Sequence, residues 1–346
     1  MFVLYIFLLL SSFTADRKEA VTIFMIGDST MANKNLAKGN IERGWGQMLP
    51  GYLTEDAVVN NHAVNGRSTL SFINEGRWEQ VLSKIHQGDY VFIQFGHNDE
   101  KLAEDLHTEP GSTFDANLKR FVNDARDKGG IPVLFNSIVR RNFPPEGATG
   151  HQYSYEKEGA VLVDTHGEYA NAPRRVAKEL NVPFIDMNKL THDLMSGMGT
   201  EKSKELFMWV PAGKYGFSPK GRVDNTHLNI YGARITAGIA IDAVVKEVPA
   251  LAPYVRHNDL VVAKDGSGDF FTVQEAVGAA YRFQKDSVSI LIRPGIYREK
   301  VNIANSKPAI TLVKQKGAVV EDSCGRRMGI TDRLIDKHTS WEIGAQ

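Results

Sequence analysis

The chain has little cysteine, no net charge and none of the short motifs that bind metals or nucleotides. Cys324 is its single cysteine, which excludes an internal disulfide and a cysteine-rich metal site. Lys plus Arg and Asp plus Glu number 41 each, so no net charge favours nucleic acid or an anionic membrane as a partner. No His-Glu-x-x-His run and no glycine-rich loop before Lys-Ser/Thr is present, which leaves zinc proteolysis and nucleotide hydrolysis without support. We therefore predict no cofactor and no metal.

Long apolar runs are also missing, apart from one at the N-terminus. Phe2–Leu10 is almost wholly apolar, and the small residues Ser11, Ser12 and Ala15 follow it, as in the core and cleavage region of a secretory signal. The run is too short to span a bilayer comfortably, and it lacks a positively charged leader. We expect residues 1–15 to be a signal segment of a secreted or periplasmic protein, with no stable membrane insertion after its removal. A buried first strand is the alternative.

Apolar strand-like runs alternate with helical patterns in the first 250 residues. Runs typical of strands occur at Val21–Ile26, Ala57–Asn60, Tyr90–Phe95, Ile131–Phe135 and Val182–Ile185. Helical spacing predicts helices at Phe114–Lys128 and Ile230–Val245. This alternation predicts an α/β fold with a doubly wound parallel sheet. The polar, Gly- and Pro-containing stretch Arg141–Gly167 is expected to form loops over the sheet edge, where substrates are usually contacted.

Four short polar blocks stand where they can meet at one edge of that sheet. They are Gly27–Ser29, Asn65–Ser68, Gly96–Asp99 and Asp224–His227. The first three follow predicted strands, and the fourth precedes the last predicted helix. Because parallel strands deliver their carboxyl-terminal loops to the same edge, we expect these blocks to lie close together.

The residue types in these blocks fit acyl transfer. That reaction needs a nucleophile, a base, a group that orients the base, and donors for the oxyanion. Ser29, His227 and Asp224 can fill the first three roles, and the Gly66 N–H and the Asn98 amide can donate to the oxyanion, each donor being worth about 3 kcal/mol. Taken singly, Gly66 fits a turn, Asn98 a helix cap, and Asp224 with His227 a surface ion pair. Together, in this order, they predict a serine esterase.

The four blocks resemble the motifs of the SGNH hydrolases, also called GDSL-type esterases. Arg43–Gln47 and Asp164–Gly167 resemble one branch of that family, the rhamnogalacturonan acetylesterases. The resemblance covers roughly Val21–Val255. It implies a flavodoxin-like αβα sandwich with a parallel sheet.

The resemblance also implies residue roles. Ser29 is expected to be the nucleophile, with Asp224 and His227 completing the triad. The oxyanion hole is expected to comprise the Ser29 N–H, Gly66 and Asn98. Four side chains in or beside the motifs are expected to bind substrate: Asp28, Arg67, His97 and His166.

The pattern changes after a boundary near Val248–Pro253, which predicts domains at 16–255 and 256–346. Asp259–Val277 and Pro294–Val301 resemble the opening of a pectin methylesterase, a family that folds as a right-handed parallel β-helix. One helix is expected at Thr272–Phe283, and strands are expected at Ser289–Arg293, Tyr297–Ile303 and Ala309–Val313.

The C-terminal tail departs from the pectin methylesterase pattern. Lys314–Gln346 does not continue the strand pattern, and no counterpart of that family's catalytic blocks is found. A solenoid with one or two coils keeps an unpaired edge. We therefore expect an incomplete β-helix without methylesterase activity.

The combined sequence predicts a secreted serine esterase that removes acetyl groups from acetylated plant cell-wall polysaccharide. Fusion to a pectin methylesterase-like segment favours pectin or rhamnogalacturonan as the substrate. One alternative is an esterase for acetylxylan or another carbohydrate acyl ester. A second is a non-catalytic carbohydrate-binding protein that stacks sugars on exposed aromatic rings. The candidate rings for that role are Trp45, Trp78, Trp209, Tyr153 and Tyr155.

Overall fold

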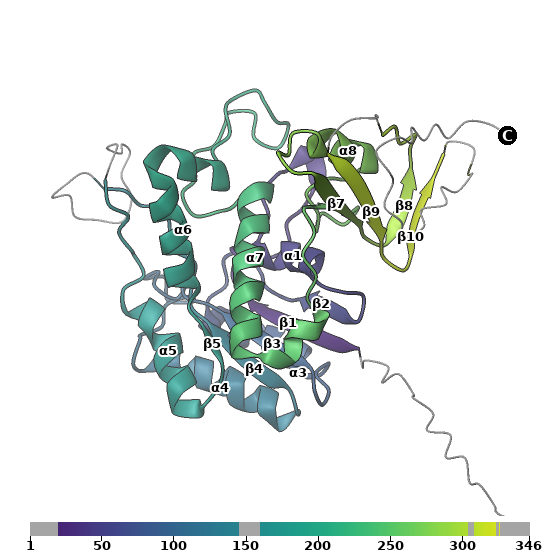
Figure 1. The fold of residues 1–346 in the computed structure, drawn as a ribbon. Helices are drawn as coiled ribbons and strands as arrows, with labels where there is room; N and C mark the ends of the chain where they lie inside the picture. Colours follow the sequence, from purple (N-terminus) through teal and green to yellow (C-terminus); the bar gives the residue numbers. More distant parts are fainter. Residues whose placement is uncertain (1–19, 145–159, 304–307, 323–324, 326–346) are drawn as a thin grey trace, which may run out of the picture.

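A computed structural model describes residues 20–144, 160–303, 308–322 and 325. Helices lie on both sides of a central sheet, and a smaller body that carries α8 and β7–β10 lies beside it (Figure 1). The predicted signal segment, Cys324, Tyr153 and Tyr155 lie outside the described residues.

The central sheet has five parallel strands in the order β2-β1-β3-β4-β5. The strands are β1 (Val21–Gly27), β2 (Ala57–Asn61), β3 (Tyr90–Gln94), β4 (Ile131–Phe135) and β5 (Phe184–Ile185). This is the flavodoxin-like strand order, so the predicted fold of the first domain is confirmed. The order reverses between β1 and β3, and ligands bind at the carboxyl ends of strands at such a point.

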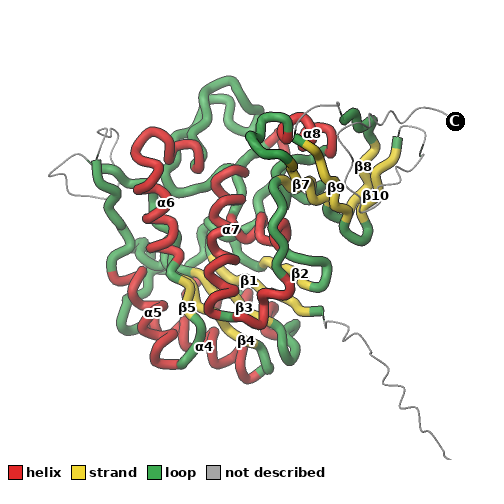
Figure 2. Tube along the Cα trace, viewed as in Figure 1, coloured by secondary structure: helices red, strands yellow, loops and turns green. Residues whose placement is uncertain are grey.

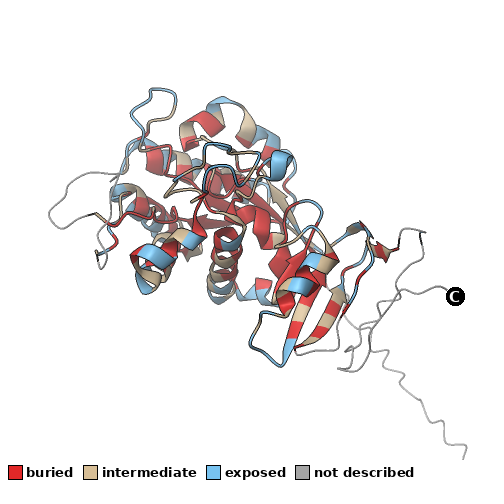
Figure 3. Cartoon of the chain, turned by 90° about the horizontal axis from the view of Figure 1, so that it is seen from above, coloured by how far each residue is buried: buried red, intermediate tan, exposed pale blue. Residues whose placement is uncertain are grey.

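Helices cover both faces of the sheet, which explains why its central strands are apolar throughout. All five residues of β3 are buried, as expected for a parallel strand that is covered on two sides. One face carries α1 (Trp45–Met48), α6 (Met187–Lys202) and α7 (Ile230–Glu247). The other face carries α2 (Thr69–Asn74), α3 (Arg77–Leu82), α4 (Thr113–Asp127) and α5 (Glu168–Leu180). The buried residues accordingly form a continuous layer on and around the sheet (Figure 3).

Figure 2 shows the helices and strands of both domains joined by loops and turns. Short 3₁₀ turns also connect these elements. They are η1 (Ala37–Gly39), η2 (Leu49–Tyr52), η3 (Ser203–Leu206) and η4 (Pro249–Tyr254).

The boundary between the two domains is visible in the apolar clusters. Tyr254 is the last buried residue of the main apolar cluster, and the next buried apolar residue, Leu260, belongs to a separate cluster.

The C-terminal segment builds its own small core from parallel strands and one helix. Its elements are β6 (Leu260–Val262), α8 (Val273–Ala280), β7 (Ser287–Ile292), β8 (Gly295–Arg298), β9 (Ala309–Lys314) and β10 (Ala318–Glu321). They form a β6-β7-β9 sheet and a β10-β8 pair, both parallel.

The expectation that the strand pattern ends at residue 313 is wrong for Ala318–Glu321. Ala318 and Val320 are buried while Val319 and Glu321 are half-buried, and this alternation lets β10 pair with β8. Only four residues carry the pattern, which is too short a run to stand out in the sequence.

The C-terminal segment packs directly on the first domain. The Gln315 side chain donates to the Leu53 carbonyl at 3.0 Å, and Arg43 Nε donates to the Gly266 carbonyl at 3.0 Å. The buried Arg234 donates to the Asn258 carbonyl at 3.0 Å. Since these donors are buried, removing the segment would leave polar groups of the first domain without partners.

Gly232, in the first turn of α7, provides a test of how closely α7 packs against η3. A Cβ at this position would lie 2.0 Å from the Leu206 carbonyl oxygen, whereas a Cβ at Gly197 in α6 would meet nothing within 4 Å. We expect Gly232→Ala to lower the free energy of unfolding by about 1–3 kcal/mol. Gly197→Ala is expected to raise it by about 0.5–1 kcal/mol, because alanine loses less backbone entropy in a helix.

Urea unfolding of both variants and the parent checks this. Equal midpoints for Gly232→Ala and the parent would mean that α7 moves away from Leu206 without cost.

Candidate active site

Ser29 lies at the tip of the turn that follows β1. Gly27 ends the strand where a Cβ would lie 2.5 Å from the Gln94 carbonyl, so only glycine fits. The Asp28 carboxylate accepts hydrogen bonds from the Thr30 N–H at 2.9 Å and the Thr30 hydroxyl at 2.8 Å. This fixes the turn and leaves Ser29, which is half-buried, between two anchored residues.

The structure brings Ser29, His227 and Asp224 into one hydrogen-bonded row. His227 Nε2 lies 2.9 Å from Ser29 Oγ, and His227 Nδ1 lies 2.8 Å from Asp224 Oδ2. An ionised carboxylate only accepts hydrogen bonds, so Nδ1 carries the proton and the Nε2 lone pair accepts from the Ser29 hydroxyl. The row can therefore withdraw a proton from the serine.

Asp224 is held in its ionised form. Burial on its own would raise the pKa of this carboxyl. The hydrogen bond and the charge of His227, together with the N–H groups of His227 and Thr226, outweigh burial and keep the pKa well below its usual value. Those two N–H groups donate to Oδ1 at 2.9 and 2.8 Å, which leaves Oδ2 for the imidazole and for Arg222.

Backbone bridges on both sides hold the loop that carries His227. The Met208 N–H donates to the His227 carbonyl at 3.0 Å, and the Arg43 N–H donates to the Leu228 carbonyl at 3.0 Å. The Asn229 side chain then caps α7 by accepting from the Gly232 N–H at 3.0 Å. The imidazole is thus presented by backbone that is tied to two other segments.

Gly66 and Asn98 lie next to each other at the same edge. Gly66 has a φ of +76°, a conformation that favours glycine, and its N–H has no acceptor among the described residues. The Asn98 amide donates one hydrogen to the Arg67 carbonyl at 3.0 Å, and its oxygen accepts from Lys101 Nζ at 2.7 Å. Its second amide hydrogen stays available for an oxyanion.

Lys34, which the sequence analysis did not single out, ties these segments together. Its side chain is 3% exposed, and its ammonium group donates to the Ser29 carbonyl at 2.6 Å and to Asn65 Oδ1 at 2.6 Å. Its third partner is the Glu42 carboxylate at 2.9 Å. Burial lowers the pKa of Lys34 against the opposing effect of Glu42. One buried cation therefore joins the Ser29 turn to the Gly66 loop.

Glu42 and Arg222 extend this network to the base. Glu42 Oε2 accepts from Arg222, and Arg222 Nε donates to Asp224 Oδ2 at 3.1 Å. Glu42 thus lies between two cations, Lys34 and Arg222, and balances their charge beside His227. The Glu42–Arg222 pair joins residues 180 positions apart, so the sequence pattern does not reveal it, whereas Arg222 and Asp224 are two residues apart.

Three of the four side chains that were predicted to bind substrate are almost fully buried. Asp28, His97 and His166 are at most 3% exposed. His166 bonds Glu100 at 3.0 Å and the Ile138 carbonyl at 3.0 Å through its two ring nitrogens. The fourth, Arg67, is half-buried and forms an ion pair with Glu75 at 3.1 Å.

The His97 side chain is buried beside that of His166. Burial lowers its pKa well below the usual value, and its ring meets His166 edge-on at 4.5 Å between centroids. Neither of its ring nitrogens has a partner among the described residues. It supports the strand end that presents Asn98.

The structure describes three of the five aromatic candidates for sugar stacking. Trp45 and Trp78 are fully buried, and their indole N–H groups donate to Gln94 at 2.6 Å and Asp124 at 2.8 Å. Trp209 is half-buried beside Arg141, with ring centroid and guanidinium 5.2 Å apart. The rings in the described part of the chain therefore offer no exposed stacking platform at these positions.

A cavity of about 650 Å³ is lined in part by Lys101, whose ammonium group donates to the Asn98 side chain. Its lining includes Glu100, Lys101, Arg140, His166 and Tyr169. Among the residues that the structure describes, no cluster of three or more His, Cys, Asp or Glu side chains could hold a metal ion. None of the described helices is long and apolar enough to cross a membrane.

Comparisons with known proteins agree with this fold and its motifs. Residues 25–235 match the GDSL-like Lipase/Acylhydrolase family, and residues 259–327 match the Pectinesterase family. The chain belongs to the GDSL-like Lipase/Acylhydrolase family and is a carboxylic ester hydrolase with a pectinesterase-like segment at its C-terminus.

Two curated proteins and one solved structure are similar to most of this chain. The chain is 38% identical to "Rhamnogalacturonan acetylesterase RhgT" of Bacillus subtilis over 66% of this chain and 90% of that protein. It is 25% identical to the rhamnogalacturonan acetylesterase of Emericella nidulans over 72% of this chain and 93% of that protein. The solved structure of YxiM from Bacillus subtilis has a TM-score of 0.55 and 26% identity, covering 68% of this chain and 58% of that one.

The pectinesterase similarity is high but short. The chain is 49% identical to a pectinesterase/pectinesterase inhibitor of Ficus pumila over 16% of this chain and 10% of that protein. It is equally identical to probable pectinesterase 56 of Arabidopsis thaliana, of which it covers 19%. The chain thus spans less than a fifth of the length of these two relatives.

The free amide hydrogen of Asn98 leads to a first kinetic prediction. Asn98→Ala is expected to lower kcat about a hundredfold, because one oxyanion donor is lost. Steady-state hydrolysis of 4-nitrophenyl acetate measures this. The control is Lys101→Met, which removes only the partner of the amide oxygen and should cost far less. Unchanged turnover in Asn98→Ala would remove this residue from the oxyanion hole.

The position of Glu42 between two cations leads to a second kinetic prediction. Glu42→Gln leaves Lys34 and Arg222 unbalanced beside His227, which disfavours the imidazolium that forms during catalysis, and we expect kcat to fall about tenfold. Glu321→Gln, which breaks the Arg298–Glu321 ion pair in the C-terminal segment, is the matched control. Equal rates for the two variants would contradict an electrostatic role for Glu42.

Asp99 leads to a prediction about pH and stability. Burial raises its pKa to about 7, although Thr69 and Thr108 donate hydrogen bonds to Oδ1. An unfolded Asp has a pKa of about 3.9, so the folded protein binds one more proton between these values and loses stability as pH rises from about 4 to 7.

Asp99→Asn should remove this contribution. Relative to that variant, the parent is expected to lose a few kcal/mol of unfolding free energy between about pH 4 and pH 8, at about 1.4 kcal/mol per pKa unit. Urea titrations across this range measure it, with the exposed Asp105→Asn as control. A constant difference between the parent and Asp99→Asn would mean that the Asp99 pKa is not raised.

Proposed function

We propose that this protein is a secreted serine esterase that removes acetyl groups from a pectic polysaccharide, with acetylated rhamnogalacturonan as its favoured substrate. The observation that carries the proposal is the row from Ser29 Oγ through His227 to Asp224, with separations of 2.9 and 2.8 Å. It lies at the strand-order reversal of a fold whose relatives include rhamnogalacturonan acetylesterases.

The first half of the reaction forms an acetyl-enzyme. Ser29 Oγ attacks the acetyl carbonyl carbon while His227 Nε2 takes the hydroxyl proton. The carbonyl oxygen becomes an oxyanion that accepts from the Ser29 N–H, the Gly66 N–H and the Asn98 amide. Collapse of this intermediate breaks the ester bond, and the imidazolium gives its proton to the departing sugar oxygen.

The second half releases acetate. A water molecule attacks the acetyl carbonyl of the Ser29 ester, and His227 takes one of its protons. The second tetrahedral intermediate collapses with Ser29 Oγ as the leaving group, which regains its proton from His227. Asp224 stays ionised throughout and stabilises each imidazolium, in agreement with its lowered pKa.

The substrate assignment combines similarity with the form of the site. Two of the relatives named above are rhamnogalacturonan acetylesterases, and one is 38% identical over most of its length. The cavity beside Asn98 carries both acidic and basic side chains, which suits a polar alcohol portion better than a lipid chain.

We also infer that the C-terminal segment is the start of a parallel β-helix and has no methylesterase activity of its own. Support comes from β7 and β9, which pair in one parallel sheet, while β8 and β10 pair in another, as successive coils of a solenoid would. The short pectinesterase match agrees with this. Export from the cytoplasm is inferred from the apolar run Phe2–Leu10.

An acetate-release panel tests the function. The full chain and Ser29→Ala are each assayed on acetylated rhamnogalacturonan, acetylated homogalacturonan and acetylated xylan, with methanol release from methylated pectin measured in parallel. We expect the full chain to release acetate fastest from acetylated rhamnogalacturonan and to release no methanol from methylated pectin. Ser29→Ala is expected to release no acetate. Faster acetate release from acetylated xylan than from rhamnogalacturonan would make xylan the favoured substrate. Acetate release by Ser29→Ala would overturn the serine mechanism.

A further inference from the structure

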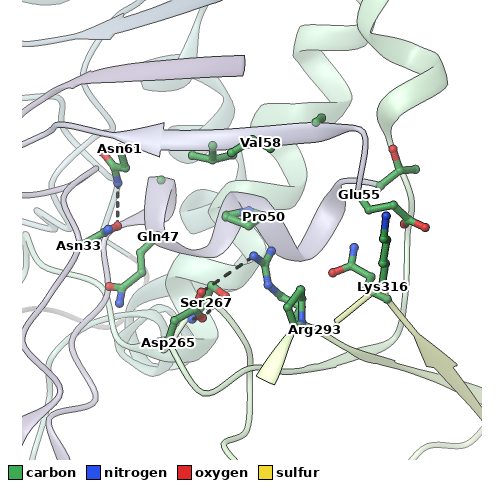
Figure 4. Close-up of a pocket in the computed structure, with 16 residues that line it drawn as sticks. Asn33, Gln47, Pro50, Glu55, Val58, Asn61, Asp265, Ser267, Arg293 and Lys316 are labelled. Atoms are coloured by element: carbon green, nitrogen blue, oxygen red, sulfur yellow. Dashed lines mark hydrogen bonds and ion pairs between the residues drawn. The ribbon is translucent and has the colours of Figure 1, made fainter. Parts of the chain in front are cut away.

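A second cavity, of about 390 Å³, lies between the first domain and the C-terminal segment (Figure 4). Its floor on the first domain is the outer edge of β2, together with α1 and η2. Its opposite wall is built from the loop after β6 and the turns after β7 and β9. Neither domain forms this cavity alone, and the function proposed above makes no use of it.

The wall from the C-terminal segment presents the largely buried guanidinium of Arg293, which has an unused donor at Nε. The Arg293 side chain is 17% exposed, and its Nε has no hydrogen-bond partner among the described residues. Its nearest carboxylate, Asp265, is 3.9 Å away and 65% exposed. A buried guanidinium with an unpaired N–H lacks stabilisation that a bound carboxylate would supply through paired hydrogen bonds. Burial also lowers the pKa of Arg293.

The rest of the lining offers a second cation, neutral hydrogen-bonding groups and one further carboxylate, Glu55, which pairs with Arg256 at 3.6 Å. Lys316 is exposed and has no ion pair within the described part of the chain. Gln47 and Asn33 each use their amide oxygen, accepting from the Lys34 N–H and the Asn61 amide, which leaves their NH₂ groups for a ligand. Val58, 55% exposed, adds an apolar surface. Amides beside a small apolar surface suit the hydroxyls and ring carbons of a sugar.

Hydrogen bonds link the lining of the cavity to the Ser29 turn. Gln47, in its lining, accepts from the N–H of Lys34, and Lys34 Nζ in turn donates to the Ser29 carbonyl. Asn61, at the end of β2, donates to the Met31 carbonyl at 2.9 Å. A chain bound along β2 would therefore run toward the segment that carries the nucleophile.

We propose that this interdomain cavity is a binding subsite for a uronate unit of an acidic oligosaccharide. The carboxylate lies against Arg293 and Lys316, and the hydroxyls meet the Gln47 and Asn33 amides. As a part of substrate recognition it rests on the proposed esterase function, but the binding itself does not. It gives the C-terminal segment a role in holding the polymer that needs no catalytic residue of its own.

Calorimetric titration of the full chain carrying Ser29→Ala tests the subsite without turnover. The probe is trigalacturonate, with xylotriose and sodium acetate as the neutral and the simple-carboxylate comparison. We expect trigalacturonate to bind, xylotriose to bind far more weakly, and acetate not to compete. Arg293→Gln should weaken trigalacturonate binding at least about tenfold, since a charge-assisted pair is lost.

Two further variants keep the test decisive. Lys316→Gln changes an exposed residue, so its fold is retained, and it should weaken binding several-fold. Arg298→Gln alters an arginine on the same segment that pairs with Glu321 instead of lining the cavity, and it should bind as the parent does. Equal binding by the parent, Arg293→Gln and Lys316→Gln, or no binding by the parent, would overturn the subsite.

Kinetics separate this proposal from the esterase function. With Ser29 intact, Arg293→Gln and Lys316→Gln should raise KM for an acetylated uronate-containing polymer, while kcat and the hydrolysis of 4-nitrophenyl acetate stay unchanged. If the full chain hydrolyses no acetyl ester yet binds trigalacturonate through Arg293, the function fails and the subsite stands. Hydrolysis without any effect of these variants on binding or KM leaves the function and removes the subsite.

Discussion

The geometry of the site depends on one buried cation. The Lys34 ammonium has three acceptors, one each from the Ser29 backbone, Asn65 and Glu42, in a place where its side chain is 3% exposed. A buried charge persists only when such partners satisfy it, so the three segments that supply them are held in one arrangement. Through Glu42 and Arg222 the same network reaches Asp224. The nucleophile, the oxyanion loop and the orientation of the base are therefore set together and not by three independent loops.

The C-terminal segment packs closely on the first domain. Arg43 of the first domain donates to the Gly266 carbonyl of the segment, and a Cβ at Gly51 would lie only 3.2 Å from Val261. Two sheets of parallel strands give the segment a core of its own. A small body that is anchored in this way is well placed to supply binding surface.

Much of the fold and the central row of the site were predictable, because each depends on local patterns. Continuous apolar runs marked β1 and β3, and the polar blocks after them stand at fixed positions relative to the strand ends. The helices α5 and α6 were not predicted, since Pro173 interrupts the pattern of one and Gly199, with a φ of +73°, breaks the other. Lys34, Glu42 and Arg222 could not be found from spacing: their partners lie up to 180 residues away and only folding brings them together. Burial was equally invisible, because the sequence does not show that Asp28, His97 and His166 are at most 3% exposed.

The central claim is that His227 and Asp224 make the Ser29 hydroxyl a nucleophile, and covalent labelling tests it most directly. Diisopropyl fluorophosphate is attacked at phosphorus by an activated serine with loss of fluoride, so the adduct marks the nucleophile. Intact-mass analysis followed by peptide mapping should find one adduct on Ser29 in the parent, none in Ser29→Ala, and greatly slowed labelling in His227→Ala. A parent that hydrolyses esters while its adduct lies on another residue, or labelling that is equally fast without His227, would contradict the account.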